Sequence, residues 1–444
     1  MNSPPEKSYW YEWYVVGVLM VAYMVAFVDR QVITLLVEPI RADLEISDTG
    51  ISLLMGLAFA IFYVTMGVPI ARLSDRYSRK HIISAGIFLW SLATAACGLA
   101  RSFGQLFLAR VGVGVGEATL TPAAYSIIAD YFPPKKQGRA IAVYSMGIYL
   151  GAGLAMVAGG AVVRLITNAD PIQLPVVGVL APWQMTFVLV GLPGLALTAI
   201  MLLTVREPTR RDLLPTDAAA VPIRDIAAFM VKNRGTFASV FLGYSAGGMA
   251  FYGFLFWVPE FIRRTYGWDI SDAGIVFGIE LAVLGSLGAY CGGWICDWLT
   301  NRGVRDAALR AASVFLGISM PVMAVTPLMP SADLAIPMLG LMAFVMSMQQ
   351  ALSPVALQLV TPNQMRAQIM ALFFLVASFC SIAMGATVVA LLTDYVFRDD
   401  GDLRYSLSLV ALVMMSLSTL SLALGLKPYR ASLDRSLAWR DGEE

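Results

Sequence analysis

Five ionisable side chains lie inside long apolar segments of this 444-residue chain. They are Asp29, Arg30, Arg110, Glu117 and Glu280. A charge at membrane depth costs roughly 2.5–3.5 kcal/mol on insertion scales, so each of these side chains should face a bundle interior and a partner. An acid that is shielded from water and lies near an arginine can load and release a proton when its surroundings change. We therefore predict proton-coupling chemistry at Asp29, Glu117 and Arg110.

The spacing of these residues supports a shared site. Arg110 and Glu117 are seven residues apart, which is two helical turns, so they lie on one face about 10 Å apart along the axis. Asp29 falls at a depth similar to that of Glu117 when both are counted from the outer ends of their segments. The alternative interpretation is a static ion pair that only orients the first and fourth segments.

The apolar segments extend over the whole chain, which is 58% hydrophobic and only 14% charged. A helix needs about 20 residues to cross the ~30 Å hydrocarbon core, and backbone groups in lipid must be satisfied internally. The sequence therefore predicts an all-α polytopic membrane protein with twelve transmembrane helices. These spans cover approximately residues 11–40, 48–73, 81–100, 104–130, 140–164, 182–205, 237–262, 272–298, 307–328, 333–353, 364–393 and 404–426.

An internal repeat divides the twelve spans into two sets of six. The hexapeptide at residues 46–51 returns at 270–275 with five identical positions, and Asp75 has a counterpart at Asp297. Such a duplication predicts two pseudo-symmetric six-helix bundles that move against each other. The predicted domains are an N-terminal bundle, a linker that includes a short surface helix near 221–231, and a C-terminal bundle with its tail. Their boundaries are 1–205, 206–236 and 237–444.

The distribution of basic residues predicts the orientation. Twenty-two Lys and Arg residues fall on the side of the N-terminus and seven on the other side, which predicts that both termini are cytoplasmic. Residues 1–13 lack the features of a signal peptide, so we expect the first span to remain in place. The expected location is the plasma (inner) membrane.

Several other functions lack their usual residues. The net charge of +1 gives no reason to expect a nucleic-acid partner, and no phosphate-binding loop for ATP occurs. The single His81 and four scattered cysteines do not have metal-ligand spacing, so we expect no metal and no cofactor. A nucleophile–base arrangement is also missing, and we predict that the chain is not an enzyme. The cysteines are Cys97, Cys291, Cys296 and Cys380.

The loop between the second and third spans, residues 67–80, resembles the signature loop G-x-L-x-D-R-x-x-R-K of the major facilitator superfamily. In that family the loop aspartate lies against the N-terminal end of a helix in the other half, where the helix dipole favours negative charge. The resemblance implies a cytoplasmic gate formed by Asp75, Arg79 and Asp130, with Asp297 as the weaker copy in the second half. The alternative is a basic loop that only sets topology.

Further motifs resemble the spinster branch of the superfamily. They are Asp29-Arg30, the loop with Tyr77 inserted, the run R-V-G-V-G-V-G-E-A at 110–118, and I-A-D-Y-F at 128–132. This resemblance implies proton-linked movement of a single-chain lipid, such as a lysophospholipid or a sphingoid phosphate. The resemblance also implies that Asp29, Arg110 and Glu117 are the residues that couple transport to protons.

The expected function is a proton-coupled secondary transporter of an amphipathic, anionic lipid that works by alternating access. Its partners would be this substrate, protons and the bilayer, and we expect a monomer. Alternatives are a drug/proton antiporter, a small organic anion/proton symporter, or a membrane receptor or scaffold that does not transport. Candidate substrate-binding residues are Arg30, Arg110, Tyr252, Glu280, Gln349 and Gln350.

Overall fold

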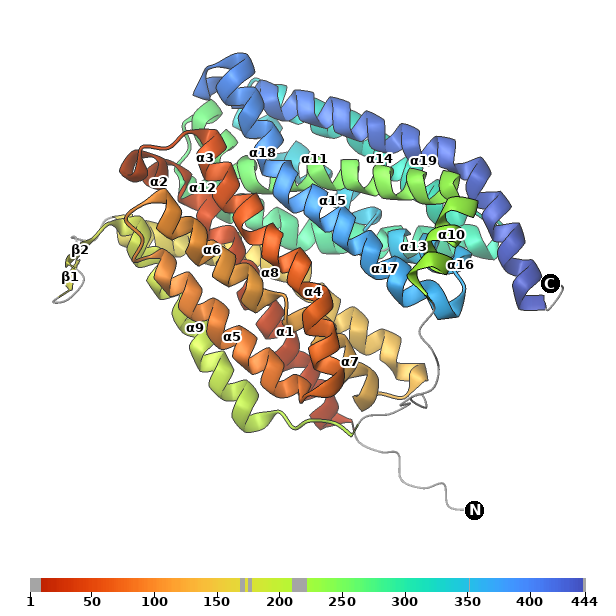
Figure 1. The fold of residues 1–444 in the computed structure, drawn as a ribbon. Helices are drawn as coiled ribbons and strands as arrows, with labels where there is room; N and C mark the ends of the chain where they lie inside the picture. Colours follow the sequence, from red (N-terminus) through yellow and green to blue (C-terminus); the bar gives the residue numbers. More distant parts are fainter. Residues whose placement is uncertain (1–8, 168–171, 175–177, 210–221, 351, 442–444) are drawn as a thin grey trace.

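The computed structural model describes residues 9–167, 172–174, 178–209, 222–350 and 352–441. Helices account for almost all of this part of the chain, and they form two bundles that follow each other in sequence (Figure 1). The predicted all-α polytopic fold is confirmed. One small addition is an antiparallel hairpin in which β1 (Ile172–Leu174) pairs with β2 (Gly178–Leu180).

The first bundle contains the six spans predicted for the first half, with η1 a 3₁₀ turn and η2 a π turn. Its helical segments are α1 (Trp10–Gln31), η1 (Val32–Leu35), α2 (Val37–Leu44), α3 (Asp48–Ser52), η2 (Leu53–Leu57), α4 (Ala58–Arg76), α5 (Arg79–Cys97), α6 (Phe103–Glu117), α7 (Leu120–Tyr131), α8 (Pro134–Thr167) and α9 (Pro182–Thr204).

The second bundle is preceded by α10 (Ile223–Lys232), a short helix with one apolar and one polar face where the sequence predicts a surface helix. Its segments are α11 (Arg234–Tyr266), α12 (Ile270–Glu280), η3 (Leu281–Gly285), α13 (Ser286–Asn301), α14 (Ala307–Val325), η4 (Thr326–Leu328), α15 (Ala332–Met348), α16 (Leu352–Val360), α17 (Asn363–Ser378), η5 (Phe379–Ala383), α18 (Met384–Leu391), η6 (Leu392–Phe397), η7 (Asp400–Asp402) and α19 (Leu403–Asp441).

Local sequence signals set several helix ends. Ser47 caps α3 by accepting a hydrogen bond from Gly50 N–H, and Ser102 caps α6 in the same way from Gln105 N–H. At the other end of α11, Gly267 has a φ of 71°, a conformation that glycine adopts without a steric penalty. These local hydrogen bonds and turn preferences determine where the helices begin and end without requiring tertiary contacts.

Eleven of the twelve predicted spans contain, within the described residues, a helical stretch long and apolar enough to cross a membrane. The exception is span 104–130, because Ala118 and Thr119 divide it into α6 and α7. Glu117 is the last residue of α6. In transporters, helices that are interrupted at membrane depth often border the binding site.

The second half is interrupted at the matching position. Here α15 ends at Met348 and α16 begins at Leu352. The internal repeat aligns Glu117 with Gln349, the residue that directly follows α15. The two halves therefore share a broken helix, but only the first half has an acid at the break.

Glycines of α6 fix the depth of this break. A Cβ atom on Gly114 would lie 2.3 Å from the carbonyl oxygen of Phe59 in α4, and one on Gly116 would lie 2.7 Å from Cβ of Trp90 in α5. Only glycine allows so close an approach of neighbouring backbones. The repeated glycines in R-V-G-V-G-V-G-E thus hold α6 against α4 and α5 and fix where Glu117 lies.

The two bundles meet along two seams. On one, Gly153 of α8 faces Gly278 of α12, and an added Cβ on either would lie within 2.6 Å of a backbone oxygen of the other helix. On the second, a Cβ on Gly56 would lie 2.5 Å from the carbonyl oxygen of Ile382. Gly56 belongs to η2 and Ile382 to η5, so two π turns face each other across the bundles.

We call the end of the molecule that carries α2 and α3 the network end, and the end that carries the loop Tyr77–Ser78 the latch end (Figure 1). The ion pairs that join two described residues across the bundles all lie at the network end, together with the hydrogen bonds of Thr49 to Asp394. The bundles are therefore tied together at one end of the molecule.

Candidate functional site

The interrupted helix presents Glu117 to an arginine of α1. Glu117 Oε2 accepts a hydrogen bond from Arg30 Nη2 at 2.6 Å, and both side chains are almost completely buried. The other carboxylate oxygen of Glu117 and Nε of Arg30 are buried without a hydrogen-bond partner among the described residues. The pair is thus an ion pair with unused hydrogen-bonding capacity.

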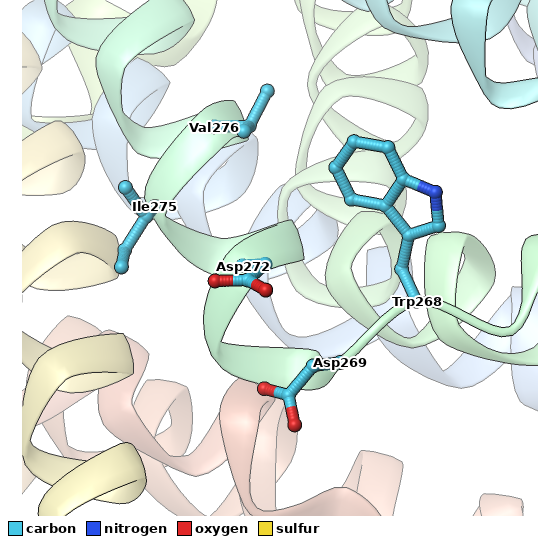
Figure 2. Close-up of a pocket in the computed structure, with 5 residues that line it drawn as sticks. All are labelled: Trp268, Asp269, Asp272, Ile275 and Val276. Carbon is cyan, nitrogen blue, oxygen red and sulfur yellow. The ribbon is translucent and has the colours of Figure 1, made fainter.

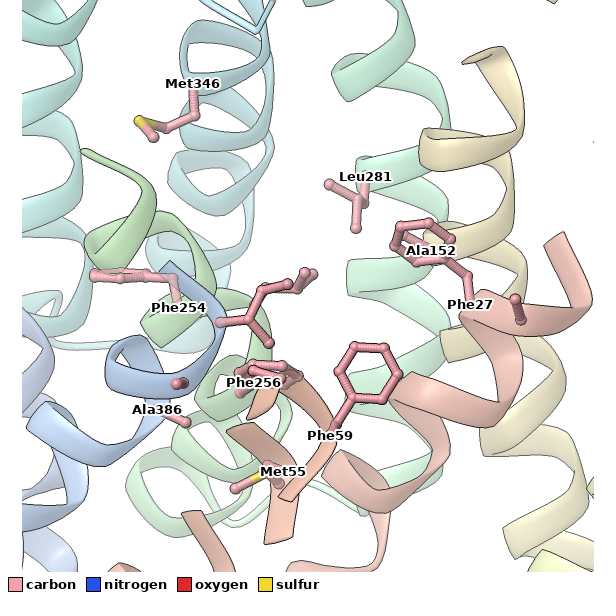
Figure 3. Packing of buried hydrophobic residues seen from close by; sticks show 14 of the residues in the cluster. Phe27, Met55, Phe59, Ala152, Phe254, Phe256, Leu281, Met346 and Ala386 are labelled. Atoms are coloured by element: carbon pink, nitrogen blue, oxygen red, sulfur yellow. The ribbon is translucent and has the colours of Figure 1, made fainter. Parts of the chain in front are cut away.

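Aromatic rings surround the Arg30 guanidinium. Its Cζ atom lies 4.8 Å from the ring centroid of Phe27, 4.3 Å from Phe59 and 5.1 Å from Tyr63. Contacts of this kind stabilise a cation in a desolvated place. Tyr252 of α11 also lies close to Arg30, so the second bundle contributes to the site. Figure 3 draws Phe27 and Phe59 within the same buried cluster as residues of the second bundle.

Arg110 contacts backbone carbonyl groups and no acidic side chain among the described residues. It donates to the carbonyl oxygens of Asp29 at 3.0 Å, of Arg30 at 3.4 Å and of Leu54 at 3.3 Å. Carbonyls near a helix end lack intrahelical partners, and α1 changes to a 3₁₀ turn just after these two residues. Leu54 lies in the π turn η2. Arg110 therefore fastens two irregular backbone segments, and it forms no ion pair with Glu117 among the described residues.

Asp29 forms no ion pair or hydrogen bond with Arg30 or Glu117 among the described residues. Its carboxylate is fully buried, and neither oxygen has a hydrogen-bond partner in the described part of the chain. The polar side chains that face it are Trp90 and Thr94 of α5. Asp29 thus lies within the packing of the first bundle beside α5, whereas Glu117 pairs with Arg30, and a site shared by the two acids stays a prediction.

The remaining substrate candidates are dispersed. Gln349 is buried beside the interruption between α15 and α16, whereas Gln350 is exposed. Glu280 faces α15, where a Cβ on Gly340 would lie 3.1 Å from its Oε1, and its Oε2 has no described partner. Of the predicted set, the structure brings together Arg30, Glu117 and Tyr252.

At the latch end, Arg79 forms the ion pair with Asp130 that the sequence suggests. Arg79 also donates from Nε to Glu207 Oε1 at 2.8 Å, a residue that the sequence analysis did not identify. The side chain of Asp75 lies outside the described residues, and Asp297 is exposed without an ion pair to any described residue. The gate function of these residues stays a prediction.

Glu207 is the acid that organises the start of α5. It accepts hydrogen bonds from Ser78 Oγ and from Lys80 N–H, each at 2.9 Å, in addition to the one from Arg79. Burial raises the pKa of Glu207, but these hydrogen bonds outweigh burial and hold the pKa below its ordinary value. A depressed pKa in the folded state stabilises the protein above the ordinary value of 4.5 and ceases to do so as the pH falls through the lower folded value.

We expect Glu207→Gln to lower the free energy of unfolding at pH 7 by about 1 kcal/mol, because charge-assisted hydrogen bonds to a half-buried group are replaced by weaker ones. The difference from wild type should shrink as the pH is lowered below 4.5. Thermal unfolding in detergent between pH 3 and 8 measures this. Glu45→Gln, at an exposed acid without a described ion pair, is the control and should show no change. If the difference in the free energy of unfolding between Glu207→Gln and the wild type grew as the pH fell, the role assigned to Glu207 would be contradicted.

The network end holds a buried ion-pair cluster that the sequence analysis missed. Arg264 of α11 donates to both carboxylate oxygens of Asp48 in the first bundle, at 2.6 and 2.8 Å, and to Glu260 at 2.6 Å. All three side chains are at least 95% buried. Arginine and carboxylate groups in such bidentate geometry form the strongest hydrogen bonds of this kind.

More peripheral pairs extend the cluster across the bundles. Arg41 contacts Asp48 at 3.1 Å and Asp400 at 2.8 Å, and Arg263 contacts Glu38 at 3.0 Å. We call these residues, with Arg264 and Glu260, the outer network. One signal was available in the sequence: Asp48 lies in the first copy of the repeated hexapeptide, and Arg263 and Arg264 lie shortly before the second copy, but these arginines were used only for topology.

Among the described residues, one group of acids and one separate pocket lie away from the central site. Asp48, Asp394 and Asp400 lie close enough to approach one cation, but arginines hold Asp48 and Asp400, and Thr49 donates twice to Asp394. Their negative charge is therefore already compensated. A separate pocket of about 480 Å³ lies at the start of α12 and contains no predicted site residue (Figure 2). It is lined by Trp268, Asp269, Asp272, Ile275 and Val276.

Comparison with known proteins identifies the family. The model of the Major Facilitator Superfamily matches residues 19–386, which is most of the chain. The chain belongs to the Major Facilitator Superfamily. Members of this superfamily are transporters, so the protein is a multi-pass membrane transporter and not an enzyme. The superfamily resemblance of the 67–80 loop is thereby confirmed.

Individual relatives refine this placement. An MFS-type efflux pump of Mycolicibacterium smegmatis is 30% identical over 403 residues, which cover 90% of this chain and 89% of the pump. A probable L-galactonate transporter of Escherichia coli is 24% identical over 311 residues, covering 68% and 65%. The crystal structure of a bacterial homologue of the human lysosomal transporter Spinster, inward-facing and unoccupied, has a TM-score of 0.77 and 28% identity, covering 98% of both chains. The superfamily branch is spinster-like, as the span 4 motif indicates.

Proposed function

We propose that the protein is a proton-coupled secondary transporter that moves an anionic, amphipathic single-chain lipid between its two bundles by alternating access. The observation that carries this proposal is the buried Arg30–Glu117 pair at a broken helix, with Tyr252 of the other bundle beside it. Arg30 is the group that attracts the head group, and Glu117 is the proton carrier. Aromatic rings next to Arg30 offer apolar surface to the lipid tail.

Proton uptake and anion binding depend on each other in this arrangement. Arg30 is neutralised by Glu117, and removing one partner of a buried ion pair costs about 3–5 kcal/mol because the other charge is left uncompensated. When Glu117 takes up a proton, an anionic head group can replace the lost charge beside Arg30. The proton and the anion therefore bind to the same state of the transporter, which favours their movement together.

Asp29 is assigned as a second proton site within the first bundle. An isolated buried charge is expensive, and its carboxylate has no hydrogen-bond partner among the described residues. Arg110 acts on this region through the backbone of α1, because it holds the carbonyl groups of Asp29 and Arg30. We assign Arg110 a positioning role rather than direct contact with substrate.

The closed network end and the basic residue count together suggest the conformation. With both termini in the cytoplasm of a cell whose plasma membrane holds the protein, the network end is external and the latch end internal. Contacts between the bundles at the network end then correspond to a state that opens inward. Asp75, Arg79, Asp130 and Asp297 would close the latch end in the opposite state.

A second candidate is a symporter of small organic anions with protons. The similarity to a probable L-galactonate transporter favours it, because that substrate is also an anion and would use the same arginine. The chemistry of Arg30 and Glu117 is the same in both candidates. They differ in whether the remainder of the substrate is an acyl chain or a polyhydroxylated chain.

The test is counterflow in proteoliposomes with four unlabelled competitors: a lysophospholipid, a sphingoid phosphate, a hexuronate and a lipophilic cation. We expect the two lipids to compete with labelled lysophospholipid, more strongly with longer chains, and uptake to increase when the substrate side is acidified. Counterflow of hexuronate alone would replace the proposal by the second candidate. Counterflow of the cation alone would overturn both.

A further inference from the structure

An apolar groove lies on the surface of the first bundle between α4 and α5, near the latch end. It has a volume of about 540 Å³, within the usual size range of ligand pockets. Its walls come from the last turns of α4 and the first turns of α5, and its floor from Val115 near the end of α6 and Thr119 in the interruption that follows. The lining residues are Ile70, Leu73, Tyr77, Ser78, His81, Ile82, Ala85, Gly86, Leu89, Val115 and Thr119.

The groove opens to the surroundings of the bundle, and those surroundings are lipid. Helices α4 and α5 each pack closely on α6 but barely on each other, and the groove lies between them. Leu73 and Leu89 on its two walls are each more than 40% exposed, as are other apolar residues farther along α5. In a membrane protein such a surface contacts acyl chains, because lipid is the solvent of a spanning helix.

The mouth of the groove is basic. His81, the single histidine of the chain, lies there and shares a 2.9 Å hydrogen bond with Ser78 through Nδ1, which leaves its Nε2 available. Lys80 precedes it and forms no ion pair with a described residue. Between Ala71 and Lys80 the sequence has four basic residues and one acid. Although Arg79 is neutralised by Asp130 and Glu207, an excess of positive charge remains.

The floor of the groove is the rear side of the interrupted helix. Val115 and Thr119 lie two residues before and two residues after Glu117. A Cβ on Gly86 would lie 1.8 Å from Oγ1 of Thr119, so α5 and the interruption are in direct contact. An occupant of the groove therefore touches the backbone that carries the central acid, from the side opposite to the bundle interface.

We propose that this groove binds one acyl chain of an anionic phospholipid of the surrounding leaflet, with the phosphate held by Lys80 and His81. Basic pockets between transmembrane helices recognise lipid head groups in this way. The apolar walls supply the place for the chain, and the excess of positive charge selects an anionic over a zwitterionic head group. Through Val115 and Thr119, the bound lipid supports the break at Glu117, so this is a regulatory lipid site separate from the transport site.

Native mass spectrometry of the full-length protein tests the proposal. The protein is purified through an affinity tag that contains no histidine. The delipidated protein is titrated with phosphatidylglycerol or with phosphatidylcholine of the same chains. We expect one phosphatidylglycerol molecule to bind in preference to phosphatidylcholine. Lys80→Gln should weaken its binding roughly fivefold, the effect of one basic side chain near an anionic lipid. Ala85→Phe, which fills the groove from an exposed position, should abolish the preferential binding.

Leu92→Phe is the matched control, because Leu92 lies on the exposed face of the same helix but outside the groove. This variant should bind phosphatidylglycerol as the wild type does. Glu117→Gln should also bind it normally, which separates this site from the proposed transport mechanism. Equal binding of the two lipids by the wild type would overturn the selection of an anionic lipid. Wild-type binding by Ala85→Phe would overturn the groove as its place.

Discussion

Glu117→Gln is expected to abolish uptake driven by a pH gradient, while substrate exchange at equal pH continues. Glutamine has the shape of a protonated glutamate and carries no charge, so Arg30 stays available to an anion in either pH condition. Coupling free energies between two ligands are typically 1–3 kcal/mol, or roughly 5–150-fold in affinity, and this variant should lose that factor. Proteoliposome uptake with and without an imposed gradient measures both quantities.

Glu280→Gln is the matched control. Glu280 is also an acid within a predicted span, but it lies on α12 in the second bundle and has no described ion pair. Its replacement should leave the pH dependence of uptake intact. If Glu117→Gln retained a normal response to the gradient, or if Glu280→Gln lost it, the proton would have to be carried elsewhere than at Glu117.

Sequence patterns predicted the architecture well, because its determinants are local or periodic. Apolar length fixes the number of spans, and the duplicated hexapeptide fixes the division into two sets of six. The unusual run at 110–118 marks the interrupted helix, since its glycines are required by the close approach of Gly114 and Gly116 to neighbouring backbones. Burial of the acids at 29 and 117 also follows directly from their apolar surroundings.

The pairing of the charges was not predictable in the same way. Adjacent helical residues differ by about 100° in direction, so the side chains of Asp29 and Arg30 leave α1 in different directions. The two residues lie at nearly the same depth in the membrane, and the position of a residue along its apolar segment predicts only this depth. Which of the two faces α6 depends on the rotation of α1, which the packing of both neighbours determines. For this reason the prediction grouped Glu117 with Arg110 in the coupling site and named Arg30 only among the substrate-binding candidates.

The outer network was missed for a related reason. Asp48 and Arg264 are 216 residues apart and belong to different bundles, so no spacing rule connects them. Both lie near the ends of spans, where charged residues are common and are normally solvated. Their near-complete burial results from the contact between the bundles in this conformation. A contact that exists in only one state of a moving protein leaves little periodic trace in its sequence.

Arg264→Gln should open the network end. The substitution leaves Asp48 and Glu260 buried without their main cation, and removing one partner of a buried ion pair costs about 3–5 kcal/mol. Separation of the bundles relieves this cost because water can then reach both carboxylates. Spin labels at Gly104 and Leu334, two exposed positions near the network end in different bundles, would report the opening as a shift to longer distances.

Arg164→Gln separates a specific effect from a general loss of charge. Arg164 also pairs across the bundles, with Asp272 at 3.3 Å, but both side chains are about half exposed, and exposed pairs contribute only about 0–1 kcal/mol. Its spin-label distances should match those of wild type. Arg264→Gln should also slow uptake, because each transport cycle must close the network end again and the variant lacks the pair that stabilises closure. Unchanged distances in Arg264→Gln would mean that the glycine seams and the other pairs of the outer network hold this end closed without Arg264.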